Sequence, residues 1–155
     1  MVRLLCDRRG TSAVEHALIL PTFFLLLLVL LETGWQFAVA VGVDHGARRG
    51  ARWVSIGADA PEGLTRAQQF AQLVVTSSGL PLDPSRLSVT PTAFSSYAAL
   101  ATAGTPGLGG PDEVVRYVVT YQSRPLTPLT ASLLPNGWLN YRSVVIAQNE
   151  PYPAN

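Results

Sequence analysis

Residues that carry catalytic or redox chemistry are scarce in this chain of 155 residues. Cys6 is the single cysteine, so no internal disulfide can form. The two histidines, His16 and His45, lie about 29 residues apart on what we expect to be one helix, too far apart to share a metal ion. Ser55 lacks the glycine that leads a nucleophile elbow. These absences predict no enzyme, no metal site and no cofactor.

Charge is also sparse. Only 14% of the residues are charged, and the formal net charge is +1. Such a balance gives no basic surface of the kind that binds nucleic acid, so we expect no nucleic-acid partner. The sparsest part lies near the N-terminus, where the sixteen residues between Glu15 and Glu32 carry no full charge.

What this uncharged stretch does contain is a long apolar run. A bilayer hydrocarbon core of about 30 Å needs roughly 20 helical residues, and Ala17 to Gln36 supplies that length. Trp35 would then lie at the membrane interface, where amphipathic rings are enriched. The removal of one amide donor at Pro21 predicts a bend or local loosening near Ala17. The sequence therefore predicts one N-terminal membrane-spanning helix.

Three interpretations of this helix remain open. It could be a plain membrane anchor. It could be a secretory signal cut after Ala40, since Ala38-Val39-Ala40 is a small-x-small site, although the apolar run is long for a signal and Glu32 precedes the site. It could also follow a short basic leader that is cut off before the apolar run, so that the helix is kept.

Glu15 at the entrance of the apolar run favours the third interpretation. A carboxylate within a membrane is costly and usually has a partner. A cut after Gly10 would create a new α-amine on Thr11, close enough in sequence for that amine and Glu15 to neutralise each other between two staggered copies. We therefore interpret Glu15 as a charge that sets the register between subunits.

Two end segments carry a resemblance to a known family. The first is Gly10, four residues, Glu15 and an apolar run containing Pro21; the second is Gln148-Asn149-Glu150-Pro151-Tyr152. Together they resemble the TadE-like pseudopilins of the tight-adherence (Flp, type IVb) pilus, which have a type IV prepilin processing site. His16 stands where the family usually has Tyr or Phe.

This resemblance implies the roles of several residues and partners. Gly10 would precede the cut, Thr11 would be the new N-terminus, and Glu15, His16 and Pro21 would belong to the assembly region. The partners would be the lipid bilayer, other pilins or pseudopilins, a prepilin peptidase and a pilus assembly platform. The chain would be a single-pass protein of the bacterial cytoplasmic membrane with its C-terminal domain outside. The alternative is a membrane-anchored surface binding domain that does not polymerise.

The remaining chain predicts an α+β fold in three parts: a leader over 1–10, the helix over 11–53 and an outer domain over 59–155. A short amphipathic helix should begin near Asp59-Ala60-Pro61-Glu62 and end at Gly79. Alternating β-branched and aromatic residues predict an antiparallel sheet of about three strands, over 86–91, 113–122 and 139–146.

Overall fold

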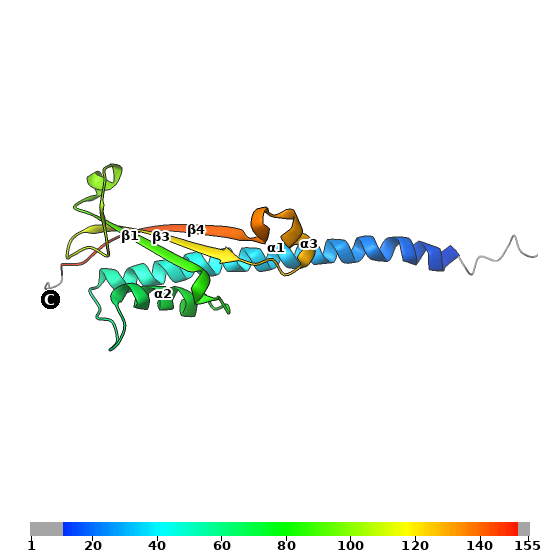
Figure 1. The fold of residues 1–155 in the computed structure, drawn as a ribbon, viewed down its shortest axis with the longest axis horizontal. Coiled ribbons are helices and arrows are strands. Elements are labelled where there is room, and N and C mark those ends of the chain that lie inside the picture. The colour runs from blue at the N-terminus through cyan, green and yellow to red at the C-terminus, as the bar shows by residue number, and fades with distance from the viewer. Residues whose placement is uncertain (1–10, 152–155) are drawn as a thin grey trace, which may run out of the picture.

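The computed structural model describes residues 11–151, a long helix with a small α+β domain built around its C-terminal half (Figure 1). The predicted leader over 1–10 lies outside the described residues. In chain order the elements are α1 (Thr11–Ser55), α2 (Arg66–Ser77), the 3₁₀ turn η1 (Pro84–Arg86), β1 (Leu87–Phe94), η2 (Tyr97–Ala101), β2 (Thr105–Pro106), β3 (Val114–Ser123), α3 (Pro128–Leu133), η3 (Pro135–Gly137) and β4 (Leu139–Gln148).

The two halves of α1 have different surroundings. The N-terminal half projects from the domain as a free rod, whereas the C-terminal half packs against α2 and the sheet (Figure 1). A stripe of small apolar residues at a spacing of four faces the core, each at most 1% exposed: Val39, Val43, Ala47 and Ala51. The predicted helix and the predicted outer domain therefore share one hydrophobic core.

The sheet has four strands in the order β2-β1-β3-β4, and every neighbouring pair is antiparallel. β3 is central, and its alternate residues fill the core, as the period of two predicts: Val115, Tyr117, Val119 and Tyr121. Tyr117 stacks on Phe70 of α2, with ring centroids 4.9 Å apart. The predicted α+β fold with its antiparallel sheet is confirmed. The two-residue strand β2 was not among the predicted strands, because two residues are too few to show an alternation of apolar and polar side chains.

α2 lies unusually close to α1 because three glycines of α1 face it. A Cβ at Gly46 would overlap the backbone of Val74, and one at Gly50 would lie 3.0 Å from the Phe70 ring. Gly42 is similarly close to Ser78. The spacing of four among these glycines thus allows α1 and α2 to pack closely inside the domain.

The start of α2 differs from the prediction. Thr65 is the N-cap and forms a capping box with Gln68, so the helix begins about one turn after Glu62. Gly63 has a φ of +82°, a left-handed conformation that ends any helical turn beginning at Asp59. The acidic residue and the early proline were therefore a weaker start signal than the threonine.

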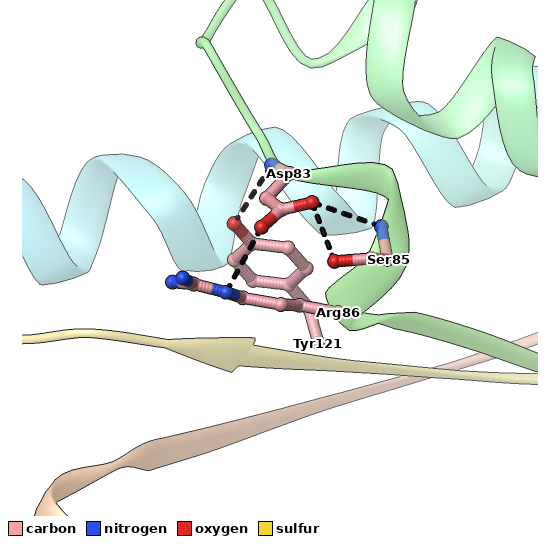
Figure 2. A network of polar contacts seen from close by, with 4 residues as sticks. All are labelled: Asp83, Ser85, Arg86 and Tyr121. Carbon is pink, nitrogen blue, oxygen red and sulfur yellow. Dashed lines mark hydrogen bonds and ion pairs between the residues drawn. The ribbon is translucent and has the colours of Figure 1, made fainter.

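A polar corner links α2 to the sheet (Figure 2). Asp83 Oδ1 accepts hydrogen bonds from the Ser85 amide at 3.0 Å and the Ser85 hydroxyl at 2.7 Å. Arg86 pairs with the other carboxylate oxygen at 3.1 Å, and the Asp83 amide donates to the Tyr121 hydroxyl at 3.2 Å. The corner fixes where β1 begins and so fixes its register against β3.

The C-terminal segment closes the domain. The Asn149 side chain is 1% exposed, and its amide group donates to the carbonyls of Leu108 at 3.1 Å and Gly110 at 2.8 Å. The Glu150 amide donates to the carbonyl of Ser55 at 2.7 Å. The glycine-rich loop, the end of β4 and the end of α1 are thereby held together.

Candidate functional site

The free half of α1 is the most unusual surface of the molecule. Every residue from 12 to 31 is exposed, and none of the most apolar window of the helix is buried within the molecule. The exposed side chains include two phenylalanines, Phe23 and Phe24, and an unbroken run from Leu25 to Leu31. By length and composition this helix can cross a membrane.

The sequence-predicted site residues lie on this free half. Glu15, His16 and Pro21 are all exposed. His16 Nδ1 lies 2.7 Å from the Ser12 carbonyl, within its own helix. Within residues 11–151 the Glu15 carboxylate has no hydrogen bond or ion pair, so it is free to meet a group from another molecule. Thr11 is the first residue of α1, and Gly10 lies outside the described residues.

Pro21 does not interrupt the helix. α1 runs without a break from Thr11 to Ser55 with Pro21 inside it. The helix is therefore not interrupted near Ala17, where the sequence predicts a bend or local loosening.

The free half ends abruptly at Glu32, which is only 6% exposed although residue 31 before it is exposed. Its carboxylate accepts hydrogen bonds from two backbone amides of the loop after β3. The Leu126 amide lies 2.9 Å from Oε2 and 3.2 Å from Oε1, and the Thr127 amide lies 3.1 Å from Oε2. Glu32 has no ion-pair partner in the described part of the chain, so backbone amides do the work of a cation.

Gln36 extends this contact into the sheet. Its Nε2 donates to Glu32 Oε1 at 2.6 Å, while its Oε1 accepts from the Ser123 hydroxyl at 2.9 Å and the Tyr141 hydroxyl at 3.0 Å. Burial and the negative charge of Glu32 raise the pKa of Tyr141, which keeps its hydroxyl protonated as the donor. The network of Glu32, Gln36, Ser123 and Tyr141, here called the junction network, joins the last turn of the free helix to β3 and β4.

The family comparison covers this same helix. Residues 10–52 match the family model described as TadE-like protein. These residues are similar to that family, and they are called the TadE-like segment below. Comparison with curated proteins and with solved structures gave no match. The resemblance carried by the N-terminal residues is thus confirmed, over a stretch that contains both the free half of α1 and most of its packed half.

The TadE-like segment also contains the possible secretory cleavage site after Ala40. The small-x-small site Ala38-Val39-Ala40 lies in the middle of α1, where Val39 is 1% exposed within the core. A cut after Ala40 would remove Glu32, Gln36 and Val39 from the domain. The packing therefore disfavours a secreted domain that begins at Val41.

Sequence reasoning did not foresee the junction network within the TadE-like segment. In the sequence, Glu32 is an isolated charge, and the apolar length alone places Gln36 at the end of the membrane span. The available signal was their spacing of four, which places both side chains on one helix face, next to an apolar stripe of the same phase. The partners Ser123 and Tyr141 carry no such signal, because they are about 90 and 105 residues away in the sequence.

The described residues hold no cluster that could bind a metal. From residue 11 to residue 151, no group of three or more His, Cys, Asp or Glu side chains is placed to hold an ion. The site is therefore best described as an apolar helix surface with a polar junction at its base.

Proposed function

We propose that this chain is a minor pilin or pseudopilin of a Tad/Flp-type pilus system. One observation supports the proposal above the others: the TadE-like match coincides with a helix whose first half is apolar and wholly exposed. An isolated domain in water would not keep so large an apolar surface uncovered. A bilayer before assembly, and the helices of other pilins after it, would both cover it.

The proposal includes processing at the N-terminus. A prepilin peptidase would cut after Gly10 and release residues 1–10, leaving Thr11 as the new N-terminus. The exposed part of the remaining helix, residues 12–31, has 20 residues and so a length of about 30 Å, which matches a hydrocarbon core. We place the span here rather than at Ala17 to Gln36, because Glu32 and Gln36 are buried against the domain. The domain would lie outside the bacterial cytoplasmic membrane, and no catalytic role is assigned to it.

Glu15 is the residue proposed to direct assembly. Its exposed carboxylate lies one turn after Thr11, within reach of the Thr11 amine of a neighbouring copy or another pilin. A neutralised pair would lower the cost of placing a charge in the apolar layer. Pilins that meet at this pair would have a defined axial stagger, which the assembly platform could then extend.

The test separates assembly from membrane anchoring. Glu15→Ala and the control Glu62→Ala are expressed in the native host, and the protein is quantified by immunoblot in the membrane fraction and in the sheared pilus fraction. We expect Glu15→Ala to remain in the membrane, to lack residues 1–10 and to be lost from the pilus fraction. Glu62, which is exposed on the loop before α2, should be replaceable without effect.

Two results would contradict the proposal. If the unmodified protein is absent from sheared pili and pili form without it, the chain is a membrane-anchored domain that does not polymerise. If Glu15→Ala enters pili as well as the unmodified protein does, Glu15 has no part in assembly.

A further inference from the structure

The segment from Leu126 to Leu134, here called the foot, contains α3 and connects β3 to β4. It lies at the end of the sheet from which the free half of α1 emerges (Figure 1). The amides of Leu126 and Thr127 are held by Glu32, so the position of the foot along α1 is fixed. The Thr127 hydroxyl then caps α3 by accepting from the Thr130 amide at 3.2 Å.

Three leucines of the foot are exposed, as is the polar Ser132. Leu126 is 55% exposed, Leu129 58% and Leu133 77%. Leu129 and Leu133 are one turn apart and so share a face of α3. No charged residue occurs between Arg124 and Arg142. The side chains of the foot do not form the core of the domain, yet they are not suited to water.

The foot also shares a groove with the free helix. A groove of about 200 Å³ is bordered by Phe24, Leu25, Leu28 and Val29 of α1 and by Leu129 and Thr130 of the foot. Because residues 12–31 have the length of the hydrocarbon core, Leu28 and Val29 lie near its outer boundary. The groove extends along α1 from Pro21 to Val29, so the foot lies at the depth of the outer half of residues 12–31.

We propose that the foot inserts into the outer interface of the bilayer, with Leu126, Leu129 and Leu133 in contact with lipid. This inference rests on the proposed function, since it needs residues 12–31 to span the membrane. A lipid surface is favoured over a second copy because the exposed leucines continue directly from the lipid-facing surface of α1. The Glu32 contact then has a purpose: it sets the depth at which the domain sits on the membrane.

The test uses site-directed spin labels in proteoliposomes of phosphatidylethanolamine and phosphatidylglycerol. Cys6→Ser provides a full chain without thiols, and a single cysteine is then placed by Leu129→Cys or Leu133→Cys. Leu26→Cys, in the free helix, is the lipid control. Tyr97→Cys is the water control, because Tyr97 is 57% exposed on η2, at the far end of the domain (Figure 1). All four positions are exposed, so the labels do not disturb the core.

The measured quantity is the accessibility of each label to oxygen, which concentrates in lipid, relative to a water-soluble nickel chelate. We expect the labels at residues 129 and 133 to be more accessible to oxygen than to the nickel chelate. Their accessibility ratios should resemble that of the label at 26 and differ from that of the label at 97. Water-like ratios at 129 and 133, with a lipid-like ratio at 26, would overturn the insertion of the foot but would leave the proposed membrane span unaffected. Strong spin–spin broadening at 133 would also overturn it, in favour of a contact between copies. A water-like value at 26 would instead overturn the membrane span, and with it the proposed function.

Discussion

Glu32 and Gln36 lie one turn apart on α1, and a hydrogen bond of 2.6 Å joins their side chains. This pair marks the point where the helix stops being free and becomes part of the domain. Glu32 binds the loop after β3, and Gln36 binds β3 and β4 through Ser123 and Tyr141. The apolar free half of α1 thereby has a fixed attachment to the domain.

Glu32→Ala should release the foot. The partly buried amides of Leu126 and Thr127 would lose their acceptor, at a cost of about 1 kcal/mol. Glu32→Gln keeps one acceptor oxygen and should cost less. Hydrogen exchange of the protein in detergent should show faster exchange at residues 126 and 127 in Glu32→Ala. Unchanged protection of these two amides would contradict the role assigned to Glu32, and Glu62→Ala serves as the control.

Gly46→Ala should destabilise the domain. Its Cβ would overlap the backbone of Val74, so α2 would have to move away from α1, at a cost of about 1–3 kcal/mol. Gly34→Ala is the matched control on the same helix, because a Cβ there meets nothing within 4 Å. Alanine has the higher helix propensity, so Gly34→Ala should raise the melting temperature or leave it unchanged. Equal effects of the two substitutions on thermal melting would show that the close approach of α1 and α2 is not needed.

The stability of the domain should fall in acid. Hydrogen bonds from Arg48, at 2.9 Å, and from Ser143, at 2.8 Å, hold the pKa of Asp44 below its ordinary value of 3.8. A lowered folded-state pKa contributes stability that is complete above the unfolded pKa and is lost as the pH falls through the folded pKa. The difference in melting temperature between the unmodified protein and Asp44→Asn should therefore shrink below pH 3.8. The effect should be small, because the Asp44 side chain is 43% exposed. A melting-temperature difference that grows as the pH falls would contradict a stabilising role for the ionised Asp44 carboxylate.

Asn149→Ala should loosen the closure of the domain. The carbonyls of Leu108 and Gly110 would lose their donor in a buried place, which costs about 1–3 kcal/mol. The exposed Asn140, near the start of β4, provides the control substitution Asn140→Ala. Chemical denaturation in detergent should separate the two variants. Equal midpoints would mean that the C-terminal segment does not secure the glycine-rich loop.

The parts of this fold that were predictable are those with local, periodic signals. The alternation of Val115, Tyr117, Val119 and Tyr121 predicted a strand with these residues on one face, and in the structure that face of β3 is buried. The long apolar run predicted α1, and the pattern of Gly10 and Glu15 carried the family resemblance. In each case the residues that form the signal are close together in the sequence.

The parts that were not predictable depend on contacts between distant residues. The close contacts of Gly46 and Gly50 with α2 depend on where Val74 and Phe70 lie. Glu32 was visible as a lone charge, but its partners are backbone amides about 94 and 95 residues away. Backbone amides leave no trace in a sequence pattern, so no local rule could have named them.

The central claim is that the TadE-like helix is retained after a short leader is removed. Its most direct test is the intact mass of the native protein purified from the membrane fraction. The account predicts a chain that begins at Thr11 and keeps the whole of α1. A chain that begins at Met1, or a soluble chain that begins at Val41, would contradict it.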